Sequence, residues 1–109
     1  MKKTVWIAYD LGVKGDYEGL YSWLDNHGAN ECGHNIAVLE YDVKQNLIEE
    51  LQKDITESVS LSKQDRIYLI WREAGKIKGK FIVGKRKAAP WFGYGAQEPQ
   101  IDEEVEQHV

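Results

Sequence analysis

Asp10 is the acidic residue whose position most strongly suggests chemistry, because it directly follows the apolar run of residues 4–9 (TVWIAY). A run rich in β-branched and aromatic residues is typical of a buried strand, so Asp10 is expected at the end of a strand, before a loop that contains two glycines. Carboxylate oxygens bind Mg²⁺, and two such groups can meet across a two-fold axis. Asp10 is therefore a candidate catalytic residue and metal ligand. The alternative is that it accepts backbone N–H groups in a turn.

Residues 75–95 (GKIKGKFIVGKRKAAPWFGYG) combine positive charge with aromatic side chains. Six lysines and arginines fall between residues 76 and 87, and three aromatic residues follow. Basic side chains attract phosphates and aromatic rings stack on unpaired bases. The candidate nucleic-acid-binding residues are Lys80, Lys85, Arg86, Lys87 and Trp91. The alternative is a solvated basic hairpin followed by an aromatic segment that docks on the core or on a partner subunit. The stretch lacks the GxxxxGK[ST] pattern of a phosphate-binding loop.

Other polar residues have simpler explanations. Asp16 precedes a helical pattern and is expected to cap that helix by accepting free N–H groups of its first turn. His27, Cys32 and His34 match no zinc-binding spacing, so we expect them in loops and at strand edges. Cys32 also lacks a third group that would orient a histidine beside it as part of a nucleophilic pair.

The net charge of −4 comes from the C-terminal end of the chain. Residues 97–109 hold five acidic side chains and no lysine or arginine, whereas residues 1–96 hold 13 acidic and 14 basic ones. We expect one near-neutral domain, residues 1–96, and an acidic C-terminal tail, residues 97–109, that is loosely docked or disordered. Such a tail can also cover the basic stretch.

The elements that position these residues follow from the spacing of apolar side chains. We predict strand 4–9, a helix from Tyr17 to a stop at Gly28, strand 35–41, helix 45–58, strand 66–71 and strand 80–83, with Gly75 and Gly79 bracketing the last turn. The expected buried faces are Tyr17, Leu20, Tyr21 and Leu24 in the first helix and Leu47, Ile48, Leu51 and Ile55 in the second, where Glu49, Glu50, Lys53 and Asp54 are expected to face solvent.

This order favours an α+β domain of ferredoxin-like βαββαβ type, with an antiparallel sheet and two helices on one face. One strand of that fold is missing from the pattern. It is either a short piece near residues 31–34, a hairpin that bends at Gly33, or residues 89–94 pairing across a dimer.

Length and composition limit the class of protein. The 109 residues suit one domain with one core, and a chain that is 42% hydrophobic and 29% charged is typical of globular proteins. Cys32 is the only cysteine, which excludes an internal disulfide and favours a reducing compartment. The sequence shows neither a signal peptide nor the roughly 20 apolar residues that span a membrane. We expect a cytoplasmic protein that does not enter membranes.

The N-terminal part of the chain resembles a known family. Residues 6–11 (WIAYDL), the short glycine loop, Asp16-Tyr17 at the start of a helix, and residues 89–91 (APW) after the last strand are similar to SinR-like proteins. These are small relatives of the CRISPR-associated endoribonuclease Cas-two. The resemblance covers residues 4–95 in outline, and the chain departs from the family in its short loop 11–16 and its acidic tail.

The resemblance implies a ferredoxin-like fold, a homodimer, and a Mg²⁺ site that uses one aspartate from each subunit, which maps onto Asp10. The implied activity is Mg²⁺-dependent hydrolysis of phosphodiesters by an endoribonuclease, although many members are scaffolds that hold nucleic acid. We therefore predict a homodimer that binds RNA or DNA, with Mg²⁺ as cofactor and Asp10 at the dimer axis. The alternative is a non-enzymatic interaction or scaffold module that assembles through its sheet and residues 91–94.

Overall fold

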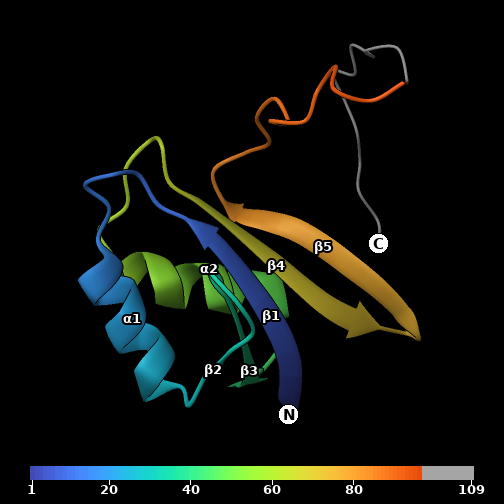
Figure 1. Ribbon diagram of the computed structural model, residues 1–109. Coiled ribbons are helices and arrows are strands. Elements are labelled where there is room, and N and C mark those ends of the chain that lie inside the picture. Colours follow the sequence, from blue (N-terminus) through green and yellow to red (C-terminus); the bar gives the residue numbers. More distant parts are fainter. Residues whose placement is uncertain (97–109) are drawn as a thin grey trace.

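The structure, a computed structural model, describes residues 1–96 (Figure 1). Five strands and two helices follow one another as β1 (Lys2–Asp10), α1 (Tyr17–Asn26), β2 (Asn30–Glu31), β3 (Ile36–Asp42), α2 (Leu47–Ser58), β4 (Arg66–Glu73) and β5 (Lys76–Val83). The predicted α+β class is confirmed. The predicted acidic tail lies outside the described residues. Within residues 1–96, neither helix is long and apolar enough to cross a membrane.

The strands form one antiparallel sheet in the spatial order β2-β3-β1-β4-β5. The first four, with α1 between β1 and β2 and α2 between β3 and β4, make an arrangement compatible with a ferredoxin-like fold. β5 extends the sheet beyond β4. Because β1 is the central strand, Val5 and Ile7 are completely buried.

The strand missing from the sequence pattern is β2, which pairs with the start of β3. The chain reverses between them at residues 32–35, where Gly33 has a φ of 133° and Asn35 a φ of 66°. A hairpin at Gly33 is therefore the correct alternative among those that the sequence left open.

The predicted start of the last strand was wrong. β5 begins at Lys76, four residues before the predicted position, because Ala74 and Gly75 both adopt positive φ and close a two-residue hairpin turn. Gly79 lies inside β5 and does not bracket the turn. A side-chain carbon at Gly79 would lie 2.4 Å from the hydroxyl of Tyr68 on β4. Any residue larger than glycine would therefore displace the tyrosine ring, which occupies the space above this position.

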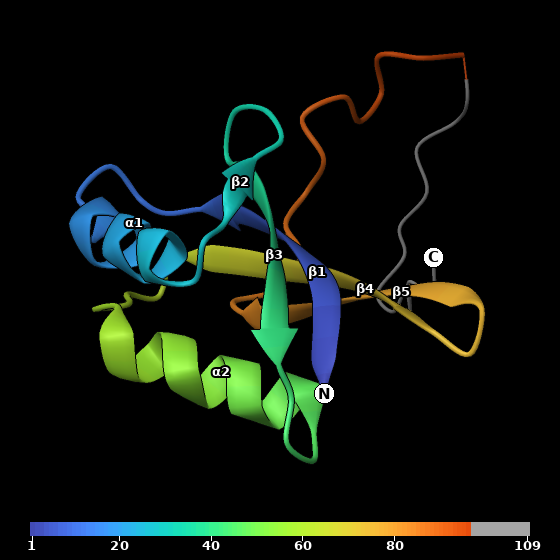
Figure 2. The ribbon, with the colours of Figure 1, turned by 90° about the horizontal axis from the view of Figure 1, so that it is seen from below.

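Both helices cover the same face of the sheet (Figures 1 and 2). Alternate strand residues point toward the helices, since side chains of a strand alternate between its two faces. The buried side chains of the sheet are Val5, Ile7, Ala37, Leu39, Tyr41, Ile67, Leu69, Trp71 and Ile82, and the helices add Leu20, Trp23, Leu24, Leu47, Leu51 and Ile55.

Both helices are capped by a polar side chain at their N-termini, and the cap of α1 is the predicted one. Asp16 caps α1, since its carboxylate accepts the backbone N–H groups of Gly19 and Ser60, each at 2.9 Å. These two hydrogen bonds, that from Ser60 above all, hold the pKa of Asp16 below its ordinary value. Asn46 caps α2 by accepting the N–H of Glu49. The predicted role of Asp16 is confirmed.

Two predicted helix faces were wrong in part. In α1, Trp23 is buried and Tyr21 is exposed, because the broad indole fills the space toward α2 and β3. In α2, Asp54 does not face solvent freely; its carboxylate accepts a hydrogen bond of 3.0 Å from the hydroxyl of Tyr41. Glu50 folds back onto the N–H groups of residues 44–46, which precede the helix.

The opposite face of the sheet has no helix over it within residues 1–96 (Figure 1). We call it the open face. It carries the half-buried side chains of Trp6, Ala8, Ile36, Val38, Tyr68, Ile70 and Phe81, which lie outside the hydrophobic core. The prediction of two helices on one face of the sheet agrees with this arrangement.

Candidate nucleic-acid interface

The predicted site residue Asp10 is held by an ion pair on the open face. It lies opposite Arg66 in the register of β1 and β4, and its Oδ2 accepts a hydrogen bond of 2.6 Å from Nη2 of Arg66. The side chain of Asp10 is 60% exposed and that of Arg66 is 28% exposed. Nε of Arg66 is buried and has no hydrogen-bond partner among the described residues. The carboxylate is therefore the more accessible half of the pair.

A pocket of about 170 Å³ lies beside this pair. Its lining residues are Ala8, Tyr9, Asp10, Arg66, Tyr68 and Phe81. The rings of Tyr68 and Phe81 meet edge to face, with centroids 4.8 Å apart and planes at 76°. Because Gly79 has no side chain, the ring of Tyr68 can lie over β5 at this position. The pocket thus joins a charged pair to an aromatic wall.

The chain after β5 brings positive charge to the same end of the sheet. Gly84, with a φ of 75°, turns tightly against the backbone of Asp65 and the side chain of Arg66. Beyond this turn, the guanidinium carbon of Arg86 lies 5.9 Å from the ring centre of Phe81. Nζ of Lys87 donates a hydrogen bond of 3.4 Å to the carbonyl oxygen of Gln64, just before β4. Residues far apart in sequence therefore meet here.

None of the five predicted nucleic-acid-binding residues lines this pocket, although Arg86 lies over the ring of Phe81, which does. Lys80 lies opposite Leu69, whose side chain is in the core, so Lys80 leaves the sheet on the helix-covered side. Lys85 is exposed next to Arg86. Trp91 is 73% exposed in a short turn, in the segment that leaves the end of β5 (Figure 1).

Asp65 is a buried acidic residue that the sequence did not single out. It is 1% exposed, and its two oxygens accept the backbone N–H groups of Gly12 and Ser62, both at 2.8 Å. These bonds tie the loop after β1 to the loop before β4. Asp65 therefore fixes the two chain segments that present Asp10 and Arg66.

The residues of one chain do not fit a magnesium site at Asp10. Magnesium needs several oxygen ligands in octahedral geometry, whereas the carboxylate of Asp10 already faces a guanidinium at 2.6 Å. Residues 1–96 contain no group of three or more histidine, cysteine, aspartate or glutamate side chains placed to hold a metal ion. A site shared between two chains stays a prediction.

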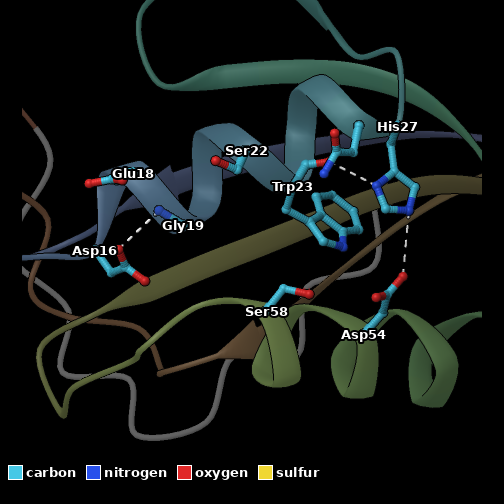
Figure 3. A pocket seen from close by; sticks show the side chains of 9 residues that line it. Asp16, Glu18, Gly19, Ser22, Trp23, His27, Asp54 and Ser58 are labelled. Carbon is cyan, nitrogen blue, oxygen red and sulfur yellow. Dashed lines mark hydrogen bonds and ion pairs between the residues drawn. The ribbon is translucent and has the colours of Figure 1, made fainter.

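A second, polar hollow of about 670 Å³ lies between α1 and α2 (Figure 3). His27 joins its two walls: Nδ1 lies 2.8 Å from the carbonyl oxygen of Trp23, and Nε2 lies 3.5 Å from the carboxylate of Asp54. The rings of Trp23 and His27 stack with centroids 4.1 Å apart. Burial, followed by the hydrogen bond to Asp54, raises the pKa of the Tyr41 hydroxyl. These contacts hold the helices together and account for His27 without a metal. The other two residues of the group considered in the sequence, Cys32 and His34, are exposed between β2 and β3.

No protein-family model matches the chain, and no curated protein and no solved structure shows significant similarity to it. The resemblance to SinR-like proteins therefore stays a prediction.

Sequence reasoning missed Arg66, Tyr68 and Phe81 as site residues. Strand 66–71 was predicted from its apolar residues, but the residues of its second face were not considered as a site. Two helices can cover only one face of a five-stranded sheet, and this count was the available signal for an exposed face.

Proposed function

We propose that this protein binds single-stranded nucleic acid on the open face of its sheet. The observation that carries the proposal is the aromatic pair Tyr68 and Phe81 in the lining of one pocket, with the guanidinium of Arg86 over the ring of Phe81. Proteins that bind single strands combine aromatic side chains, on which bases stack, with a basic groove that follows the backbone.

The positive charges on the open face are placed so that a single-stranded nucleic acid could run across it. Arg86 lies at one end, and Arg72, on the same face of β4 as Tyr68, is exposed near the other. A β-strand rises about 3.3 Å per residue, so Arg66 and Arg72 on β4 lie roughly 20 Å apart. Trp6 lies between these ends, opposite Ile70 in the register. Phosphates would contact the basic side chains while bases contact the rings between them.

The proposal assigns binding and no catalytic step. Cleavage of RNA by a shared magnesium site at a homodimer axis stays a separate prediction. A cytoplasmic location belongs to the proposal, since Cys32 is an exposed free thiol that a reducing compartment would protect from oxidation.

The test is fluorescence anisotropy of labelled oligonucleotides with the full chain over a salt series. Single strands are expected to bind more tightly than duplexes, with affinity that falls steeply as salt rises. Tyr68→Ala is expected to weaken binding by about 1–3 kcal/mol through lost stacking.

Matched charge variants separate a local effect from a general one. Arg86→Gln should lower the salt slope by about 0.7, the value for one lost phosphate contact to a single strand. Lys53→Gln removes the same charge from an exposed position on α2, on the other side of the sheet, and should leave the slope unchanged. Equal effects of the two variants, or the absence of binding at low salt, would contradict the proposal.

A second candidate function is self-association, which the segment after β5 favours. Trp91, Phe92 and Tyr94 are all exposed within the described residues, and large exposed aromatic residues are typical of interaction surfaces. In the full chain, replacing all three with serine should change the molar mass measured by light scattering if this segment holds a homodimer together. An unchanged mass would reject that role.

A further inference from the structure

The open-face pocket presents an acceptor and a donor side by side. We infer that it selects guanine within the bound single strand, an inference that rests on the proposed function. Asp10 supplies carboxylate oxygens and Arg66 supplies guanidinium N–H groups at the same end of the sheet.

The order of groups on guanine matches this pair. Its Watson–Crick edge carries one carbonyl acceptor, O6, followed by two adjacent donors, N1–H and N2–H. An ionised carboxylate accepts hydrogen bonds only, at two oxygens, and a guanidinium only donates them. Oδ1 of Asp10 has no partner among residues 1–96, so the carboxylate can accept from both donors of guanine while Arg66 faces O6.

The other bases match less well. Uracil places its donor between two acceptors, and adenine offers one donor group on this edge, so each leaves a carboxylate oxygen without a partner. Cytosine carries one donor group and two acceptors and needs the fork of a guanidinium. Nη2 of Arg66 already donates to Asp10 and its Nε is buried, so the guanidinium can face the single O6 of guanine but does not present the fork that the two acceptors of cytosine need. The exposed carboxylate therefore favours the base with two neighbouring donors.

The walls of the pocket fit one planar base. Its volume of about 170 Å³ is well below the roughly 300–1,000 Å³ of sites for drug-sized ligands. Phe81, with Arg86 at 5.9 Å from its ring centre, and Tyr68 supply rings for stacking against a base.

The experiment compares uridine-rich RNA oligonucleotides that differ at one central position. The full chain is titrated by anisotropy with oligonucleotides that carry guanine, inosine, adenine or cytosine there. Inosine lacks only the N2 amino group of guanine. We expect the guanine oligonucleotide to bind about tenfold more tightly than the inosine one, because one hydrogen bond to a carboxylate is lost.

Two variants locate this preference. Asp10→Asn should reduce the ratio of guanine to inosine affinity to less than about twofold. Glu40→Gln removes an exposed carboxylate from the far end of β3 and should leave the tenfold ratio intact. Circular dichroism checks that Asp10→Asn is folded, and Arg66→Lys provides a second variant that should also lower the preference.

The outcomes separate this inference from the proposed function. Salt-dependent binding without preference among the four bases, or a preference for cytosine, overturns guanine selection and leaves nucleic-acid binding in place. A guanine preference that persists in Asp10→Asn also overturns it. No binding of any oligonucleotide at low salt overturns both.

Discussion

Replacing Asp65 tests whether one buried carboxylate holds the binding end of the sheet together. It accepts one backbone N–H group from each of two loops, and both bonds are 2.8 Å long. A hydrogen bond to a charged group contributes about 1.5–3 kcal/mol to stability, and a buried donor left unpaired costs a similar amount.

The size of the effect follows from the two bonds. Asp65→Asn keeps one carbonyl oxygen for one N–H group but turns its own NH₂ toward the other, so we expect a loss of about 2–3 kcal/mol. Asp65→Ala removes both acceptors, and we expect about 4 kcal/mol. Either loss is a large share of the roughly 5–15 kcal/mol that stabilises a small domain.

Urea denaturation at pH 7, followed by tryptophan fluorescence, measures these losses. With a slope of about 1.5 kcal/mol/M, Asp65→Asn should lower the midpoint by about 1.3–2 M. Ser62→Ala is the control, because Ser62 donates to Asp65 through its backbone N–H, which alanine retains; its change should stay within about 0.5 kcal/mol. A midpoint for Asp65→Asn equal to that of Ser62→Ala would refute this account of Asp65.

Three further predictions concern the open face, acid stability and metal. Gly79→Ala should weaken binding of single strands about 3–10-fold, because the new carbon would meet the Tyr68 hydroxyl at 2.4 Å and displace its ring; unchanged affinity would show that this ring does not contact nucleic acid. Backbone N–H groups of residues 44–46 hold the pKa of Glu50 below its ordinary 4.5, so its contribution to stability is present above pH 4.5 and is lost as pH falls through the lower folded-state pKa. Urea midpoints at pH 5 and about pH 2.5 should therefore differ less in Glu50→Gln than in the unmodified protein, and equal differences would reject this role. Because Asp10 is paired with Arg66 within one chain, the predicted magnesium site needs a second chain. If two chains share such a site, RNA cleavage seen by gel electrophoresis should require Mg²⁺ and be lost in Asp10→Asn, whereas no cleavage, or cleavage that persists in Asp10→Asn, would reject the endoribonuclease hypothesis.

The local elements of this fold were predictable from neighbouring residues. Apolar spacing located α1 and α2, and Asp16 and Gly28 marked the ends of α1, because a helix periodicity, an N-cap and a residue with positive φ each depend on a few adjacent residues. The errors came from contacts between elements. The start of β5 was missed because Gly79, a turn residue by type, is used here to admit the ring of a residue on another strand.

The candidate site was predictable only in part. Asp10 and the cations Arg86 and Lys87 were identified by residue type and by their places in the pattern. The pairing of Asp10 with Arg66 was not predictable. The register of β1 and β4 brings these two residues together across more than fifty positions of sequence. Lys80 fell on the other side of the sheet for the same reason: its neighbour in β4, not its own type, decided its direction.

The sequence by itself determined the class of the domain, the positions of its helices and its wealth of aromatic and basic residues. The tertiary structure decided which apolar face was covered. Trp6 and Ile7 are adjacent in β1, yet Ile7 is fully buried and Trp6 is not. Strand side chains alternate between two faces, and a sheet with helices on one side only leaves the second set at the surface, which no local pattern records.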